Sequence, residues 1–300
     1  MANIVVLGSI VADISVWLDR SPLPGETIVV VDSGIFAGGK GLNQAAQAAR
    51  LGAKPLLVGM VGEDALGAFM RQAITQELGT ADGIITRKNV TTSYAIPVIE
   101  PRGQHIIHVP GANAAMTPQD VLAQIPSWGQ PQFLLVQGEV NSEATLAAMT
   151  AMAKLDVTIV LDPAPMENVT SDMLEMATIM TPNQVEFTQL VGAEAINEKQ
   201  WLAGIQSLMK RYPRLQCAII TLGSQGAFAA NRGGWHQWVK AQHIHAVDPT
   251  AAGDAFNGAW AWAMMTGHSF TEAVQLGVRV GTLVASRRGA LPSLANPSEL

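Results

Sequence analysis

The sequence of 300 residues has one cysteine, two tyrosines and few charged side chains, which make up 14% of the total. The single Cys217 excludes an internal disulfide, and its place in the apolar run 217–220 indicates a buried strand position. A formal net charge of −6 argues against nucleic-acid binding, because that function needs clustered lysine and arginine. Apolar runs stay below the roughly 18 residues of a membrane helix, and the first residues lack a signal-peptide pattern. We therefore expect a cytoplasmic protein with no membrane partner.

Short β-branched runs alternate with alanine-rich stretches of helical spacing along most of the chain. The runs predict buried strands at residues 4–7, 55–58, 133–136, 158–161, 178–180 and 218–222. Helical spacing with few breakers is found at residues 41–51, 65–78, 143–155 and 253–265. This alternation predicts one α/β domain over residues 1–300, with a mostly parallel sheet covered by helices on both faces.

Two regions interrupt this alternation. Residues 27–31, and residues 93–99 with 104–109, are predicted to be antiparallel strands, because prolines and glycines bound them. We expect them to form a small sheet outside the main one, with strands from about 14–36 and 93–110. A segment inserted between βα units can close over a site at the strand ends, so this small sheet is predicted to be a lid.

The segment from Asp248 to Asp254 follows an alternating stretch, residues 243–247, that predicts a strand, and it opens a helical run. The small residues 251–253 let the backbone approach a ligand, and N–H groups at a helix N-terminus bind anions such as a transferring phosphoryl group. Asp254 beside that site can take the proton of a substrate hydroxyl that attacks the γ-phosphorus. The alternative is that Asp254 only caps the helix.

A second glycine turn, residues 37–44, also leads into a helix. Residues 34–40 fit the spacing of a Walker A loop as far as Lys40, but Gly41 stands where that loop needs a Ser or Thr for magnesium. Without this hydroxyl, the glycines suit a turn on which a small polyol lies while Lys40 and Asn43 donate hydrogen bonds to it. A tight turn with a solvated lysine is the alternative.

Acidic and amide side chains follow other predicted strands. Asp13 falls just past the first predicted strand, and Glu139 follows a later one. Open α/β sheets bind ligands at this edge, so each carboxylate can accept hydrogen bonds from vicinal hydroxyls of a sugar. The alternative is that each is only a charged residue in a loop. Asn183 and Glu186 lie three residues apart at a predicted helix start, where they can organise Mg²⁺ or form a capping arrangement. The glycine turn 221–226 has small polar groups suited to nucleotide phosphates.

In order and spacing, these segments resemble the PfkB-type carbohydrate kinases of the ribokinase-like group, over residues 3 to about 293. The diagnostic stretches are residues 38–43, with glycines at 52 and 62 downstream, and residues 248–254. The resemblance implies a three-layer α/β/α fold with a β-sheet lid that often forms a homodimer contact. It also implies ATP-dependent phosphorylation of a primary hydroxyl of a pentose, with ribose to ribose 5-phosphate as the first candidate.

The resemblance implies a role for each matching position. Asp254 is the base, and the backbone of Ala251, Ala252 and Gly253 is the anion hole. The sugar contacts are Val11, Asp13, Gly39, Lys40, Gly41, Asn43, Glu139 and Asp254. The ATP contacts are Asn183, Thr221, Leu222, Gly223, Ser224, Gln225, Gly226, Ala227, Gly253 and Val278. Mg²⁺ is expected near Asn183 and Glu186, and an activating K⁺ at Asp248, Thr250, Ala285, Arg288, Ala290 and Ser293.

The chain departs from the family pattern at two positions. Val11 stands where an asparagine is usual and can neither donate nor accept a hydrogen bond, which favours 2-deoxyribose, another sugar or a nucleoside as alternative substrates. Pro249 replaces the more usual threonine, which predicts a stiffer cation loop. A non-catalytic sugar- or nucleotide-binding regulatory protein on the same scaffold is a further alternative. The presence of Asp254 and Lys40 argues against this alternative, because a protein that only binds its ligand needs no catalytic base.

Overall fold

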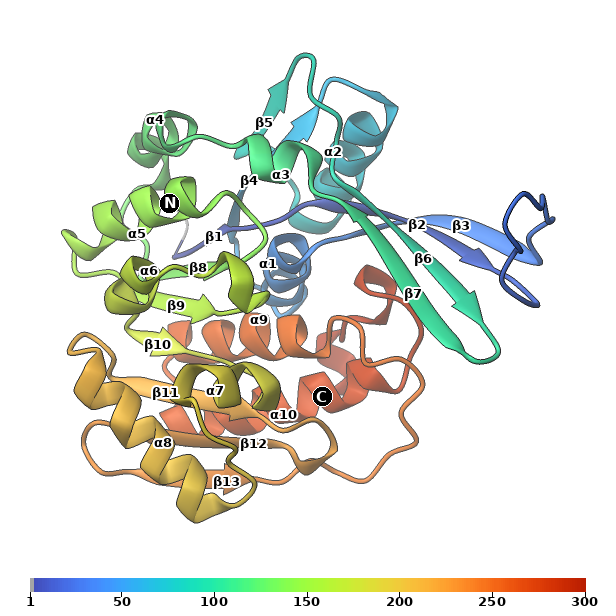
Figure 1. Ribbon diagram of the computed structural model, residues 1–300. Coiled ribbons are helices and arrows are strands. Elements are labelled where there is room, and N and C mark those ends of the chain that lie inside the picture. Colours follow the sequence, from blue (N-terminus) through green and yellow to red (C-terminus); the bar gives the residue numbers. More distant parts are fainter. Residues whose placement is uncertain (1–2) are drawn as a thin grey trace.

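The computed structural model describes residues 3–300 and contains two β-sheets, the larger of which is surrounded by helices (Figure 1). The main sheet has the strand order β13 (His236–Val239), β12 (Ala227–Asn231), β11 (Cys217–Thr221), β10 (Ile179–Met180), β9 (Thr158–Asp162), β8 (Phe133–Gln137), β1 (Ile4–Leu7), β4 (Leu56–Gly62) and β5 (Ile84–Arg87). Neighbours are parallel from β5 to β11, and β12 and β13 continue the sheet antiparallel. All six predicted strands are confirmed, as β1, β4, β8, β9, β10 and β11.

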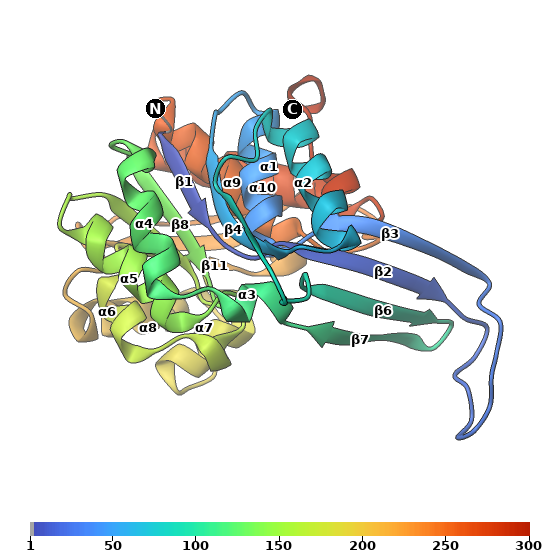
Figure 2. The same ribbon diagram turned by 90° about the horizontal axis from the view of Figure 1, so that it is seen from above.

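The buried strands divide their side chains between two apolar cores, one on each face of the main sheet. In β1, Ile4 and Val6 belong to one core, and Val5 and Leu7 belong to the other. The first core is covered by α1 (Lys40–Arg50), α2 (Ala65–Leu78), α9 (Ala252–Met265) and α10 (Phe270–Ala285). The second is covered by α3 (Gly111–Ala115), α4 (Pro118–Trp128), α5 (Ser142–Ala153), α6 (Ser171–Met176), α7 (Gln184–Val191) and α8 (Glu198–Arg211). Figure 2 shows the two helix groups on opposite sides of the strands, which confirms the predicted three-layer α/β/α class.

The second sheet projects from the body, as both views show (Figures 1 and 2). Its order is β3 (Asp32–Gly38), β2 (Val11–Trp17), β6 (Tyr94–Glu100) and β7 (Gly103–Val109), and β2 and β6 are parallel to each other. The prediction of a separate small sheet is confirmed, but the strand predicted at residues 27–31 is wrong. That segment is an irregular, largely exposed connection, because a β-branched run gains little without a strand beside it, whereas residues 32–38 pair with β2 along their full length.

Two further expectations about local structure are wrong. Residues 243–247 form no strand; they are irregular and mostly exposed, and no strand lies beside them in the described chain. Asp13 lies inside β2, in the small sheet, and not in a loop after β1. The predicted helix at 253–265 is confirmed as α9. Within residues 3–300, no helix combines the length and the apolar character needed to cross a bilayer.

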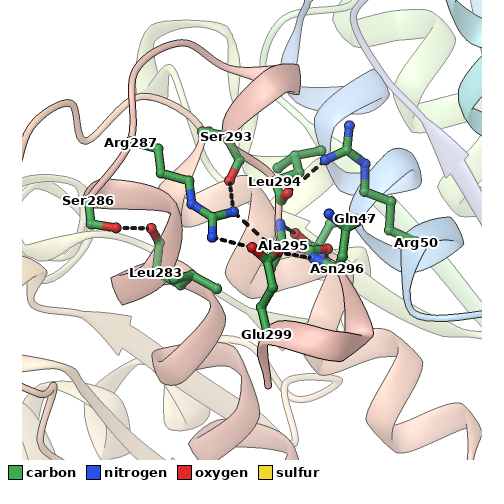
Figure 3. Close-up of polar contacts among 10 residues, drawn as sticks. All are labelled: Gln47, Arg50, Leu283, Ser286, Arg287, Ser293, Leu294, Ala295, Asn296 and Glu299. Carbon is green, nitrogen blue, oxygen red and sulfur yellow. Dashed lines mark hydrogen bonds and ion pairs between the residues drawn. The ribbon is translucent and has the colours of Figure 1, made fainter.

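Polar contacts tie the end of the chain to α1 and α10 (Figure 3). The Gln47 side chain donates to the Ala295 carbonyl at 3.1 Å and accepts from the Ala295 N–H at 2.9 Å. Arg287, just after α10, forms an ion pair with Glu299. These contacts fix the segment that follows α10, part of which borders the cleft described below.

Candidate active site

A cleft of about 1700 Å³ lies between the small sheet and the carboxyl ends of the main-sheet strands. Strands β2, β6 and β7 contribute one wall, and the segments after β8, β9 and β11, with the start of α9, contribute the other. Alternate residues of β2 line it, from Val11 and Asp13 to Ser15 and Trp17, because side chains two apart share one face of a strand. The small sheet is therefore placed where a lid would lie.

Asp254 is buried in the first turn of α9. The position that caps this helix is held by Ala251, whose φ of 63° is left-handed and whose methyl group offers no acceptor. The alternative that Asp254 is the helix cap is therefore wrong. The N–H group of Ala252 donates to the Pro249 carbonyl at 3.1 Å, whereas the N–H groups of Gly253 and Asp254 have no acceptor within residues 3–300 and are available to a ligand. A Cβ placed on Gly253 would meet nothing within 4 Å, so the turn is open on that side.

Two amides from the first turn of α1 hold the Asp254 carboxylate. Asn43 Nδ2 donates to Oδ2 at 3.0 Å, and Gln44 Nε2 donates to Oδ1 at 3.2 Å. The two helices pack closely because residue 258 is a glycine, whose Cβ would lie only 2.4 Å from the Gln44 carbonyl oxygen. This packing brings together the two glycine turns that the sequence singled out, although 211 positions separate Asn43 from Asp254.

Lys40 begins α1 and lines the same cleft. Burial lowers the pKa of its ammonium group, but the surrounding carboxylates of Asp254, Asp162, Glu139 and Glu186 together raise it above the ordinary value. Lys40 is therefore charged and partly enclosed, which is not the solvated lysine of the alternative interpretation. A fixed cation among carboxylates can attract phosphate oxygens or donate to a sugar hydroxyl.

The predicted sugar contacts converge at the small-sheet end of the cleft, with one exception. Val11, Asp13, Gly39 and Glu139 all line it. Burial, and to a smaller extent the negative charge of Glu139, raises the pKa of Asp13 to about 6. The exception, Gly41, is not among the lining residues.

Gly41 has a packing role in the structure. Its missing side chain lets the start of α1 lie against the end of β1, since a Cβ there would come within 2.5 Å of the Gly8 carbonyl carbon. The turn also depends on Gly39, which has a φ of 100° and whose Cβ would come within 2.6 Å of the Ser9 carbonyl oxygen. Glycine is thus required at both positions for steric reasons.

The other end of the cleft contains most of the predicted nucleotide contacts. Thr221, Gly223, Ser224, Gly226 and Val278 line it. The lining does not include Leu222, Gln225 or Ala227. Leu222 and Ala227 are instead buried in the core around β11 and β12.

Asn183 and Glu186 lie at the same end and form a reciprocal capping box at the start of α7. Asn183 Oδ1 accepts from the Glu186 N–H at 3.0 Å, and Glu186 Oε2 accepts from the Asn183 N–H at 2.8 Å. The capping alternative is confirmed. Burial raises the pKa of Glu186, while the Asn183 hydrogen bonds and Lys40 oppose this rise.

The loop before α9 and the loop after α10 are joined at Asp248. Its carboxylate accepts from the N–H groups of Thr250 and Gly289, both at 3.0 Å. Burial works to raise the pKa of Asp248, but these hydrogen bonds and the nearby Arg288 bring it below the ordinary value. Of the predicted cation contacts, Asp248, Thr250, Ala285, Arg288 and Ala290 line the cleft, while Ser293 is buried outside its lining.

Sequence reasoning missed two side chains at the centre of this site. Gln44 bonds to Asp254, as described above, and Asp162 lines the cleft as the last residue of β9. Asp162 follows directly after the predicted strand 158–161, so the criterion that selected Glu139 also applied to it. Gln44 gave no such signal, because its role depends on how α1 meets α9.

Comparison with known proteins gives one consistent result. The family described as pfkB family carbohydrate kinase matches residues 1–297. Ribokinase from Haemophilus influenzae is 32% identical over 298 residues, which cover 99% of this chain and 96% of the relative. Ribokinase from Bacillus subtilis is 30% identical over 300 residues, covering 100% and 98%. The structure of Arabidopsis thaliana ribokinase complexed with ribose and ATP is similar with a TM-score of 0.90, at 29% identity and coverage of 98% and 96%.

The matched family spans the glycine turn at Lys40 and the helix start at Asp254, which the fold brings into one cleft. Nearly the whole length of the chain matches enzymes of one kind in both sequence and structure. This protein belongs to the pfkB family of carbohydrate kinases and is an ATP-dependent sugar kinase.

Proposed function

We propose that this enzyme transfers the γ-phosphoryl group of ATP to the primary hydroxyl of a pentose, with ribose to ribose 5-phosphate as the first reaction to test. The observation that carries the proposal is the position of Asp254, held by two amides at the open first turn of α9 beside Lys40. The similarity to ribokinases over the full chain supports ribose as the acceptor.

In this proposal, Asp254 takes the proton of the primary hydroxyl while the hydroxyl oxygen attacks the γ-phosphorus. The bond from that phosphorus to the bridging oxygen breaks, and ADP leaves. The N–H groups at the start of α9 stabilise the charge on the transferring phosphoryl group, and Lys40 adds a positive charge to the same cleft. Asp13 and Glu139 accept hydrogen bonds from the sugar hydroxyls at the other end.

A different acceptor is favoured by one specific observation. Val11 is buried and lines the cleft beside Asp13, so an apolar surface faces the sugar region. A site that makes no hydrogen bond to a hydroxyl tolerates its absence, which makes 2-deoxyribose or a nucleoside the second candidate.

ADP formation with ribose, 2-deoxyribose, fructose and several nucleosides separates these candidates. We expect the highest kcat/KM with ribose. A higher kcat/KM with 2-deoxyribose, or turnover of nucleosides alone, would favour the second candidate, and turnover of nucleosides alone would also refute a pentose as the acceptor.

We also propose Mg²⁺ and K⁺ as cofactors. Glu186 supplies one carboxylate near the phosphates, and with Asn183 it fits a Mg²⁺ that keeps several waters and is held mainly by ATP. When bound, this ion would neutralise phosphate charge. For K⁺, the ionised Asp248 supplies the charge, but the carbonyl oxygens of Ala285 and Ala290 each already accept two hydrogen bonds. Cation binding at those two atoms therefore requires the loops to rearrange, and activity in K⁺, Na⁺ and cation-free buffers tests the proposal.

Finally, we propose a cytoplasmic homodimer formed through the small sheet. Ile35 and Phe36 of β3, and Ile106 and Ile107 of β7, are exposed by between 36% and 58%, and Phe36 and Ile106 line the cleft. Exposed apolar side chains on the two edge strands of the sheet suit a contact with a second copy. Sedimentation of the wild type and of Ile107→Asp measures the association. A monomeric wild type would contradict the proposal.

A further inference from the structure

A second buried carboxyl group shares a hydrogen-bond donor with the proposed base. Asp162 ends β9 and is only 7% exposed. Its Oδ2 atom accepts from Gln44 Nε2 at 3.0 Å and from Asn257 Nδ2 at 3.3 Å. The same Gln44 nitrogen donates to Asp254 Oδ1 at 3.2 Å. One amide therefore bridges two acidic side chains that both line the cleft.

The orientation of this amide is selected at its nitrogen. Gln44 Oε1 accepts from Gln137 Nε2 at 2.9 Å, and the Gln44 nitrogen faces the two carboxyl groups. A flipped Gln44 amide would place its oxygen against the oxygens of Asp162 and Asp254. Asp162 is therefore one of the two groups that maintain the orientation of Gln44.

The protonation state of the pair follows from its surroundings. Two carboxyl groups that accept from the same amide nitrogen, at 3.0 and 3.2 Å, are too close to be ionised together at low cost. Asp254 has amide donors on both oxygens and lies in the first turn of a helix, where the partial positive charge of the N-terminus favours an anion. Asp162 ends a strand, and within residues 3–300 its donors reach only Oδ2. The proton therefore belongs on Asp162.

The charged groups around Asp162 agree with this assignment. Burial is the main effect that raises the pKa of Asp162, to about 8. Lys40 of α1 opposes the rise, while Asp254 of α9, Glu186 of α7 and Glu139 after β8 add to it. A neutral acid also needs an acceptor for its O–H group. The oxygen Oδ1 of Asn257, whose nitrogen already contacts Asp162, is buried and has no partner within the described chain.

We propose that Asp162 is a positioning residue that works as a neutral carboxylic acid and holds the Gln44 amide against Asp254 without adding a second negative charge to the cleft. The proposal rests on the proposed function only for the role of Asp254 as base. When Asp162 ionises, it places a second negative charge beside Asp254 and repels the phosphates. Phosphoryl transfer should therefore slow above about pH 8.

Two substitutions of Asp162 distinguish its role as a hydrogen-bond acceptor for Gln44 from the effect of its charge. Asp162→Asn keeps an acceptor oxygen for Gln44 and is permanently neutral, whereas Asp162→Leu has a similar volume and no acceptor. With whichever sugar the wild type phosphorylates, we expect Asp162→Asn to stay within about threefold of the wild-type kcat at pH 7 and to lose the alkaline decline. Asp162→Leu should free Gln44 to turn away from Asp254, so it should lower kcat by roughly tenfold or more, the scale of a lost hydrogen bond to the charged Asp254, and change the sugar KM little.

Either of two kinetic results would overturn the proposal. One is an Asp162→Asn enzyme with the same alkaline decline as the wild type, because the titrating group would then lie elsewhere. The other is an Asp162→Leu enzyme that folds and keeps the wild-type kcat. Combining Asp162→Leu with Gln44→Leu should cost little more than either change alone, since both break the same bridge.

A readout that needs no turnover keeps the inference separate from the substrate assignment. The infrared difference between wild type and Asp162→Asn at neutral pH should contain the carbonyl stretch of a protonated carboxylic acid, lost as pH rises through about 8. Asp172→Asn, which changes an exposed aspartate outside the cleft, should give no such band. If the difference between wild type and Asp162→Asn lacks the carbonyl stretch of a protonated carboxylic acid, the proposal is overturned even when the enzyme phosphorylates ribose. A present band with no ribose turnover refutes only the proposed substrate.

Discussion

Replacing Asp254 by asparagine tests the proposed base with little change in shape. The variant keeps the size of the side chain but cannot accept the hydroxyl proton, so we expect kcat to fall by about 10²-fold or more, or about 2.7 kcal/mol at about 1.36 kcal/mol per factor of ten. The sugar KM should change little, because Asp13, Lys40 and Glu139 remain in the cleft.

The structure also gives the expected cost in stability. Asn43 and Gln44 each donate to one oxygen of Asp254, and an asparagine there has only one acceptor atom. One buried donor loses its partner, which costs about 1–3 kcal/mol of the free energy of unfolding and leaves the protein folded. Thermal unfolding measured alongside kcat separates this cost from the loss of catalysis.

Asp64 offers a matched control. It also lies at a helix start and accepts from the N–H groups of Gly67 and Thr92, at 2.7 and 2.8 Å, but it does not line the cleft. Asp64→Asn should therefore lower stability and leave kcat unchanged. If Asp254→Asn lowers kcat by no more than this control does, Asp254 is not the base.

Three further changes test other parts of the structure. Gly41→Ala should lower the free energy of unfolding by about 1–3 kcal/mol, measured by denaturant titration, because its Cβ would come within 2.5 Å of Gly8; a neutral result would contradict the packing role. Val11→Asn should improve kcat/KM for ribose relative to 2-deoxyribose by about tenfold, the scale of one hydrogen bond, and an unchanged ratio would show that this side chain does not face the sugar. The kcat/KM for sugar should fall as pH drops through about 6, because Asp13, whose pKa is raised, becomes neutral there and loses an acceptor; a profile flat down to about pH 5 would exclude this.

The sequence by itself determined six of the nine strands of the main sheet, the class of the fold and the two glycine turns. Short apolar β-branched runs that alternate with helical stretches favour strands of a covered sheet, so β1, β4, β8, β9, β10 and β11 were predictable without long-range information, whereas β5, β12 and β13 were not predicted. Asp254 and Lys40 were identifiable because each stands in a turn of small residues that opens a helix, a local pattern with a chemical use.

The tertiary structure decided which of these local patterns found a neighbouring strand or a hydrogen-bond partner elsewhere in the chain. Residues 27–31 and 243–247 have the composition of strands but form no ladder with a strand within residues 3–300, while β3 forms from a glycine-containing segment because β2 supplies its hydrogen bonds. Gln44 became part of the site only through the close packing of α1 on α9, whereas Asp162 stands directly after a predicted strand and only its partners depended on the packing. A hydrogen bond between residues more than a hundred positions apart depends on packing over the whole domain, and no local pattern in the sequence records it.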